Sequence, residues 1–145
     1  MPDVVCLGIL VADVIARPVD ALPHGTVSLL EEVTLHGGGC ALNTATGLAR
    51  LGLSVGIVGK IGDDPFGDFV IALLEERGLE TEGVLRDPAV PTSATVVLVD
   101  RAGERAGLHL PGANGTLVWI SPARRPPPAS GAFACIVELS PGGRP

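Results

Sequence analysis

Three consecutive glycines, Gly37 to Gly39, precede an amide side chain, Asn43, at a spacing suited to ligand binding. Glycines lack Cβ atoms, so their main-chain N–H groups can approach a bound molecule closely. A helix that starts directly behind them would point its unpaired N–H groups and the positive end of its dipole at the same place. Asn43 would add a hydrogen-bond donor and an acceptor one turn into that helix. The pattern therefore favours a polyhydroxylated ligand.

Two common phosphate-binding loops do not fit the same residues. A Walker loop needs a glycine five residues before its Gly-Lys pair and a hydroxyl residue after it. Gly59-Lys60 is present, but these two positions hold Ser54 and Ile61. A dinucleotide-binding fingerprint needs its glycines directly after the first strand, whereas here the glycine cluster comes much later in the chain. Both alternatives are excluded.

The glycine cluster and the residues after it resemble the first signature of the PfkB/ribokinase-type carbohydrate kinases. The matching residues are Gly38, Gly39, Ala41, Asn43, Ala45, Gly52 and Gly62. The alternative is an ordinary helix–strand unit whose glycines serve only turns. That alternative explains Gly52 as a helix C-cap, but it leaves the glycine cluster and Asn43 unexplained, so the family is favoured.

The resemblance implies a sugar-binding set of Asp13, Gly38, Gly39 and Asn43. In the family, an aspartate just after the first strand binds sugar hydroxyls, and Asp13 falls on that position. A carboxylate accepts two hydroxyl hydrogen bonds, and charge-assisted bonds are the stronger kind. The alternative is a solvated or helix-capping aspartate. Ribokinase-like sequences often have asparagine two residues earlier, where this chain has Val11, which argues against ribose itself.

The elements that would position these residues alternate between strand and helix patterns. Residues 3–9 and 54–59 have the pattern of strands, and residues 41–51 and 66–77 that of helices. Residues 18–35 and 92–110 are proline-interrupted or hairpin-like, and in the family such segments form a small β lid over the sugar. We therefore expect an α/β fold, a ribokinase-like parallel sheet flanked by helices with a small β lid. Alternation puts Thr95 and Val97 on one face of that lid, as candidate sugar contacts.

Two adjacent acids and three cysteines have simple structural explanations. Asp63 and Asp64 precede a proline at the start of the second helix, where helix capping explains them better than metal binding or acid catalysis. Cys6, Cys40 and Cys135 are odd in number and widely spaced, which argues against a disulfide framework or a zinc site. Cys6 is expected in the core, and Cys40 is expected to pack rather than react. No metal site is predicted.

The composition argues against several classes of partner. The net charge is −6, and the only basic cluster is Arg124-Arg125, so nucleic acid is not an expected partner. No apolar run reaches the length of about 18 residues that a membrane span needs. The acidic N-terminal segment lacks the basic start of a signal peptide. We therefore predict no membrane association and a cytoplasmic location.

The resemblance covers residues 1–117, the substrate-binding part of the family, and fades over the Pro/Arg-rich tail 118–145. In the family, a Gly-Ala-Gly-Asp motif beside the ATP site supplies the catalytic base and the anion hole, and this sequence has no such motif. Phosphoryl transfer depends on those groups. No catalytic residue is therefore assigned, and the spacing of His24, His36 and His109 links none of them to a nucleophile or carboxylate.

Two hypotheses about function stay open. The first is an ATP-dependent sugar or nucleoside kinase that transfers the γ-phosphate to a substrate hydroxyl, with a sequence that is incomplete at its C-terminus. The second is a non-catalytic sugar-binding remnant or an inactive product. The resemblance implies a sugar or nucleoside as ligand and ATP with Mg²⁺ as cofactors. It also implies a homodimer through the β lid, because two lids often clasp together in the family.

Overall fold

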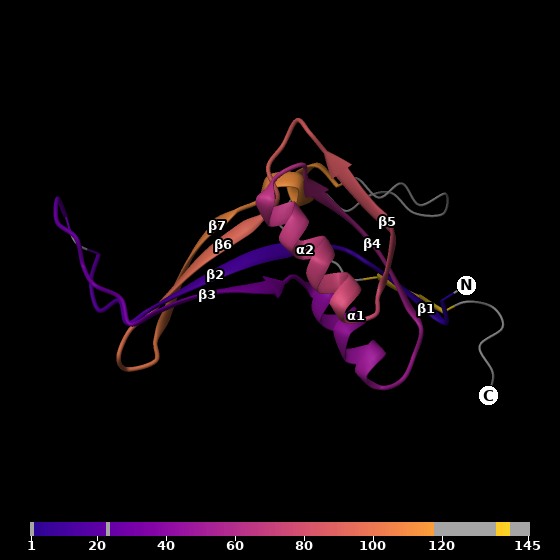
Figure 1. Cartoon of the computed structure of the whole chain (residues 1–145), viewed down its shortest axis with the longest axis horizontal. Coiled ribbons are helices and arrows are strands. Elements are labelled where there is room, and N and C mark those ends of the chain that lie inside the picture. The colour runs from indigo at the N-terminus through magenta and orange to yellow at the C-terminus, as the bar shows by residue number, and fades with distance from the viewer. Residues whose placement is uncertain (1, 23, 118–135, 140–145) are drawn as a thin grey trace.

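The computed structural model of the chain describes residues 2–22, 24–117 and 136–139. Two four-stranded sheets meet at an angle, and two helices lie in that angle (Figure 1). The central sheet has the order β5-β4-β1-β8, with β1 (Val4–Leu7), β4 (Val55–Gly62), β5 (Glu80–Asp87) and β8 (Ile136–Leu139). The lid sheet has the order β3-β2-β6-β7, with β2 (Val11–Arg17), β3 (Glu32–Gly38), β6 (Ala94–Val99) and β7 (Arg105–Leu110).

The central sheet is mainly parallel, as the sequence predicts. β1 pairs with β4 and β4 with β5 in parallel, and β8 pairs with β1 in antiparallel orientation. Aliphatic residues fill β1 and β4, which is typical of a sheet covered by helices. Their burial, worth about 25 cal/mol for each Å² of apolar surface, is the main stabilising contribution. Cys6 lies in this core with no exposed surface, which confirms its expected place.

The two helices cover this core and agree with the predicted ranges to within one residue. In α1 (Cys40–Arg50), small or compact residues form the buried face, namely Ala41, Leu42, Ala45 and Thr46. This face allows the helix to pack closely on β4. In α2 (Pro65–Glu76), Val70 and Leu74 are fully buried. Neither of these helices is long and apolar enough to cross a membrane.

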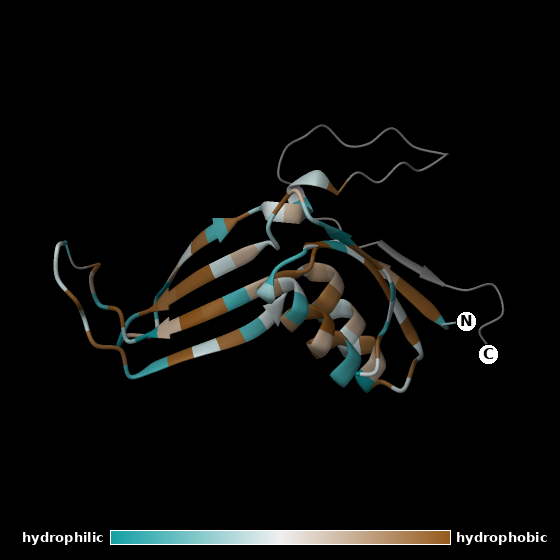
Figure 2. Ribbon diagram, turned by 45° about the horizontal axis from the view of Figure 1, so that its top comes forward, coloured by the Kyte–Doolittle hydropathy of each residue, from teal (hydrophilic) through white to brown (hydrophobic). Residues whose placement is uncertain are grey.

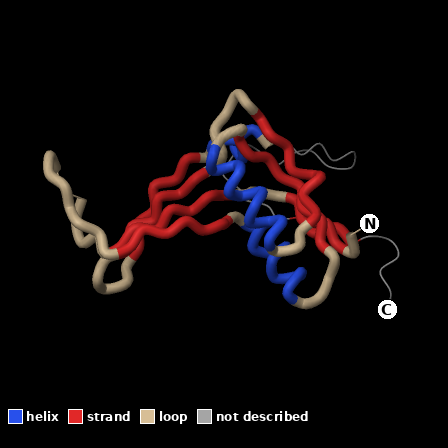
Figure 3. The backbone as a smooth tube through the Cα atoms, in the orientation of Figure 1, coloured by secondary structure: helices blue, strands red, loops and turns tan. Residues whose placement is uncertain are grey.

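The lid strands begin earlier in the chain than the segment expected at 18–35. β2 starts at Val11 and ends at Arg17, directly before Pro18, and β3 starts only at Glu32. The described residues between them, 18–22 and 24–31, form a long loop at the far end of the lid (Figure 3). Asp13 therefore lies in the middle of a strand and not in a loop after β1. In the second lid segment, β6 and β7 form a hairpin within 92–110.

The register of the lid sheet gives it two unlike faces. Cross-strand partners share a face, so His36, Asp13, Thr95 and His109 form a row with one residue from each strand. We call the face with this row the polar face. The opposite face, the apolar face, consists of Ala12, Val14, Ala16, Val33, Leu35, Gly37, Ala94, Val96, Leu98, Ala106, Leu108 and Leu110. Hydrophobic residues recur along these strands in Figure 2.

Asp64 ties the start of α2 to the segment that enters the lid. Its carboxylate caps the helix by accepting a hydrogen bond from the Gly67 N–H at 2.8 Å. It also accepts bonds from the N–H and the hydroxyl of Thr92, both at 2.7 Å. Burial raises the pKa of the Asp64 carboxyl, but these hydrogen bonds lower it more, so the pKa falls below its usual value. Helix capping is thus confirmed for Asp64, whereas Asp63 forms an ion pair with Arg86 instead.

Replacement of Asp64 by alanine is expected to destabilise the fold by about 2–4 kcal/mol, because it removes a cap and leaves the buried Thr92 groups unpaired. The pKa of Asp64 is lower in the folded state than in the unfolded state. The carboxylate therefore contributes fully to the free energy of unfolding when the pH is above the pKa of the unfolded state, and this contribution is lost as the pH falls through the pKa of the folded state. Urea unfolding of the parent and of Asp64→Ala between pH 7 and pH 2 should show the two stabilities converging on the acid side.

The matched control is Asp63→Ala. Asp63 is exposed, and its ion pair with Arg86 spans 3.4 Å, so its removal should change the free energy of unfolding by less than about 0.5 kcal/mol. Equal losses from both variants would contradict the structural role given to Asp64.

Candidate functional site

Asp13 and Gly38 meet where the lid sheet joins the helices. Asp13 is half-buried in β2, and Gly38 lies on the neighbouring strand β3, opposite Val11. A Cβ atom added to Gly38 would fall on the Oδ2 atom of Asp13. The carboxylate therefore lies directly over the Gly38 backbone, and the structure brings these two predicted residues together.

Gly39 continues this corner into the first turn of α1. It is the N-cap residue of the helix, with φ at 96°, in the left-handed region that favours glycine. A Cβ atom there would also overlap the carbonyl oxygen of Ile9, in the connection from β1 to β2. Glycine is thus required for both conformation and space. The helix start is consequently held against the chain that leads to Asp13.

The first turn of α1 presents polar groups that the described residues leave available. The N–H groups of a helix's first turn have no acceptor within the helix, and no side chain caps α1. Its first turn holds no acidic residue. The Asn43 N–H closes the turn by donating to the Gly39 carbonyl at 3.0 Å, and the Asn43 side chain is exposed. The corner thus combines the N–H donors at the start of α1 with the Asp13 carboxylate, and Asn43 follows as an exposed residue of the same turn.

The polar face extends this corner across the lid. Thr95 lies beside Asp13 on β6, and Val97 is the next residue of β6 on the same face. The Thr95 hydroxyl and the Nδ1 atom of His109 are hydrogen-bonded at 3.1 Å. On the other side, His36 is the partner of Asp13 on β3 and contacts the Thr34 hydroxyl through Nε2 at 3.0 Å.

Sequence reasoning did not assign His36 and His109 to the site, although both lie in register with Asp13. For His36 a signal exists, because it stands two residues before Gly38 and so shares its face of an extended strand. For His109 no local signal exists, since its place depends on the pairing register of β6 with β7.

Lys60, the lysine of the rejected phosphate loop, has a structural role. Its ammonium group forms an ion pair with Asp87 at 2.6 Å and donates to the Thr116 hydroxyl at 2.9 Å. The hydrogen bond from Lys60 lowers the pKa of the Asp87 carboxyl. The lysine thus joins β4 to the end of β5 and to the 3₁₀ helix η1 (Gly112–Thr116).

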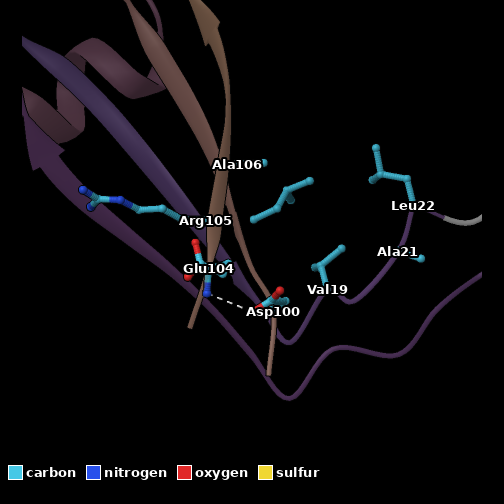
Figure 4. A pocket seen from close by; sticks show the side chains of 8 residues that line it. Val19, Ala21, Leu22, Asp100, Glu104, Arg105 and Ala106 are labelled. Carbon is cyan, nitrogen blue, oxygen red and sulfur yellow. Dashed lines mark hydrogen bonds between the residues drawn. The ribbon is translucent and has the colours of Figure 1, made fainter. Parts of the chain in front are cut away.

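A separate hollow of about 300 Å³ lies at the far end of the lid. Figure 4 shows its lining, in which Arg105 and Ala106 leave β7 on opposite sides. Leu98 and Ala106 of the apolar face line this hollow, together with Leu22 from the long loop. None of the predicted sugar-binding residues lines it. Within the described ranges, no three histidine, cysteine or acidic residues come together as metal ligands.

Comparison with known sequences identifies the relatives of this chain. Residues 1–136 match the pfkB family of carbohydrate kinases. It is 36% identical over 124 residues to a fructokinase of Klebsiella pneumoniae, covering 84% of this chain and 39% of that protein. It is 40% identical over 88 residues to a fructokinase of Vibrio alginolyticus, covering 61% of this chain and 27% of that protein.

Solved structures give a consistent result. A fructokinase from Xylella fastidiosa matches with a TM-score of 0.64 and 31% identity, over 78% of this chain and 34% of that chain. An Arabidopsis thaliana ribokinase complexed with ribose and ATP matches with a TM-score of 0.68 and 25% identity, over 76% of this chain and 36% of that chain. The chain spans less than half the length of each of these proteins.

Replacement of Gly39 by alanine is expected to destabilise the protein by about 1–3 kcal/mol, because φ is 96° there and the new methyl group would overlap the Ile9 carbonyl oxygen of the main chain. The control is Gly47→Ala in the same helix-bearing segment. A Cβ on Gly47 meets no atom within 4 Å, and alanine there should stabilise α1 by about 0.5–1 kcal/mol. Urea unfolding measures both changes. A Gly39→Ala variant as stable as the parent would refute the close contact.

Proposed function

The chain belongs to the pfkB family of carbohydrate kinases, and from this membership we propose that its described residues form the sugar-binding part of an ATP-dependent sugar kinase. In this proposal, the substrate hydroxyl that receives the γ-phosphate is oriented at the corner formed by β2 and α1. The observation that supports it most directly is the Asp13 carboxylate lying over Gly38, beside the uncapped start of α1.

The chemistry of the corner suits a sugar. The Asp13 carboxylate can accept bonds from two neighbouring hydroxyls, and charge-assisted bonds of this kind are strong. The N–H groups at the start of α1 and the Asn43 amide can donate to sugar oxygens. Because Gly38 and Gly39 carry no side chains, a ligand can approach the backbone closely. Thr95 and Val97 would then contact the sugar from the lid.

Fructose is the first candidate substrate. Both sequence relatives described above are fructokinases, and one of the matching structures is also a fructokinase. The apolar Val11, two residues before Asp13 in β2, offers no hydrogen bond where ribokinase-like sequences often have asparagine. Nucleosides form the alternative ligand class, and a binding screen separates the two.

We propose ATP and Mg²⁺ as the cofactors of the reaction, because a matching fructokinase structure contains bound ATP and a matching ribokinase structure contains ribose and ATP. When bound, they supply the transferable phosphoryl group and neutralise its charge. A base and an anion hole are needed as well, and the sequence has no Gly-Ala-Gly-Asp motif to supply them. The second candidate is a sugar-binding protein without catalysis.

ATP dependence would agree with a cytoplasmic location.

These 145 residues alone are therefore expected not to phosphorylate a sugar, because positioning without charge stabilisation leaves the barrier high. A coupled assay of ADP release, with the purified chain, MgATP and fructose, should give only the background rate. Sugar-dependent turnover well above background would contradict this expectation, and it would reveal a catalytic base within the chain.

We also propose that the apolar face of the lid binds a second copy of the chain. Close to the helices this face is covered, since Ala12 is fully buried and a Cβ on Gly37 would fall on Leu73. On the rest of this face, large apolar side chains stay 38–60% exposed: Val33, Leu35, Val96, Leu108 and Leu110. The hollow at the far end opens onto the same face. Contiguous apolar patches of this kind mark interaction sites, and a symmetric dimer is the commonest assembly.

For substrate binding, Asp13→Ala is expected to weaken fructose binding roughly ten-fold or more, because it removes a charged hydrogen-bond acceptor. Isothermal titration with fructose, other hexoses, ribose and nucleosides measures the affinity of the parent and of the variant. The control is Asp63→Ala, whose exposed carboxylate lies in the turn before α2. A parent chain that binds none of these ligands would refute the proposed function.

For association, Leu108→Asp is expected to convert dimers to monomers, because it places a charge on the apolar face, which the partner would bury. Arg105→Asp lies on the same strand but on the opposite face, and it should leave the dimer intact. Analytical ultracentrifugation gives the molar mass in each case. A parent chain that is monomeric at high concentration would exclude the proposed dimer.

A further inference from the structure

Several segments connect the lid sheet to the rest of the molecule. Two of these segments are the connection from β1 to β2, which contains Leu10, and the exit from β7 into the 3₁₀ helix η1 (Gly112–Thr116). The sequence Gly112-Ala113-Asn114 opens η1, and no part of the proposed sugar site uses it. In the structure, the side chain of Asn114 joins these two segments.

Asn114 holds both main-chain polar groups of Leu10. Its Oδ1 accepts a hydrogen bond from the Leu10 N–H at 3.2 Å, and its Nδ2 donates to the Leu10 carbonyl at 2.8 Å. The carboxamide thus bonds to Leu10 as the main chain of a neighbouring strand would. Leu10 lies between β1 and β2, outside both strands, so this amide satisfies main-chain groups that the sheet ladders do not reach.

Asn114 is itself held firmly. Its N–H donates to the Ser93 hydroxyl at 3.2 Å, and the Ala113 N–H donates to the Pro91 carbonyl at 2.8 Å. Ala113 is fully buried. Gly112 has φ at 47°, and a Cβ there would fall on the Pro91 carbonyl oxygen. Each residue of the tripeptide therefore has a steric or hydrogen-bonding requirement, and together they fix the direction of the Asn114 side chain.

Leu10 directly precedes β2, and its side chain is held firmly in the core. Its side chain is fully buried, and a Cβ on Gly59 would come within 2.7 Å of Leu10 Cδ1, so the leucine is packed tightly onto β4. Two residues later, the Ala12 N–H donates to the Ser93 carbonyl at 2.9 Å. Asp13 follows immediately. A change in the Leu10 main chain would consequently move the Asp13 carboxylate relative to Gly38.

We propose that Asn114 is a positioning residue for substrate binding: by holding the N–H and carbonyl groups of Leu10, it sets the direction of β2 and so the place of the Asp13 carboxylate. This inference rests on the proposed sugar-binding function of Asp13. It assigns a role to the Gly112-Ala113-Asn114 sequence, and it predicts that Asn114 affects sugar affinity without touching the sugar.

The test is a double-mutant cycle for fructose binding, measured by isothermal titration well below the unfolding temperature. Asn114→Ala is expected to weaken binding about ten-fold, because two hydrogen bonds that fix Leu10 are lost. Asn114→Asp keeps an acceptor for the Leu10 N–H but has no donor for the carbonyl, so a smaller loss is expected. Since Asn114 acts through Asp13, its effect should shrink in an Asp13→Asn background, and the two effects should not add.

The matched control is Thr116→Val in the same 3₁₀ helix. It removes the hydroxyl that donates to the Ala113 carbonyl and accepts from Lys60, but it leaves the bonds to Leu10 in place. Fructose affinity should not change. If Asn114→Ala does not fold, Asn114→Asp answers the question by the same measurements.

Three results would overturn the inference. An Asn114 variant that unfolds at lower temperature but binds fructose as the parent does would reduce Asn114 to a structural role. Additive effects with Asp13→Asn would show that the two residues act independently. If the parent chain binds no sugar, the proposed function fails, and this inference fails with it. In the first two cases, binding by the parent leaves the proposed function intact.

Discussion

The close approach of the Asp13 side chain and the Ile9 main chain to the backbone of Gly38 and Gly39 is the constraint on which the rest of the structure depends. The Asp13 carboxylate occupies the space of a missing Cβ on Gly38, and the Ile9 carbonyl occupies that of a missing Cβ on Gly39. A larger residue at Gly38 would displace the Asp13 carboxylate, and one at Gly39 would push α1 away from the connection between β1 and β2. The same contact therefore joins the lid to the helices and brings an acid to a helix start.

Successive side chains of the four lid strands point to opposite faces of the sheet, and this gives the lid two different surfaces. One face carries the row of Asp13, Thr95 and two histidines, and the other carries only apolar or small residues. A ligand and a second subunit could thus use the lid without competing for the same residues. A register slip of one residue would exchange the two faces. Hydrogen bonds to the Asp64 carboxylate and to the Asn114 amide hold segments at the two ends of the β6–β7 hairpin.

Much of the fold follows from local signals in the sequence. The glycine cluster with Asn43, the apolar stripe of α2 and the acid before a proline each have a short-range physical cause, and the structure agrees with all of them. β2 was harder to predict, because its residues follow β1 after only three others and carry the expected sugar-binding acid. β5 lies at the edge of its sheet and has no fully buried residue, so its sequence lacks a strong apolar pattern.

The parts of the site that sequence reasoning missed depend on long-range pairing. His109 reaches the row of Asp13 only through the register of β7 on β6 and of β6 on β2. Asn114 bonds to a residue 104 positions earlier in the chain. Neither relation leaves a local pattern, because the partners are set by how the sheets assemble.

The central claim is that sugar binds at the corner of Asp13, Gly38, Gly39 and Asn43. NMR titration of the isotope-labelled chain with fructose tests it most directly. The account predicts the largest shifts in the amide signals of Gly38, Gly39 and the first turn of α1, and smaller ones along β2 and β6. Shifts confined to the hollow at the far end of the lid, around Leu22 and Leu98, would contradict it, as would no shift at saturating sugar.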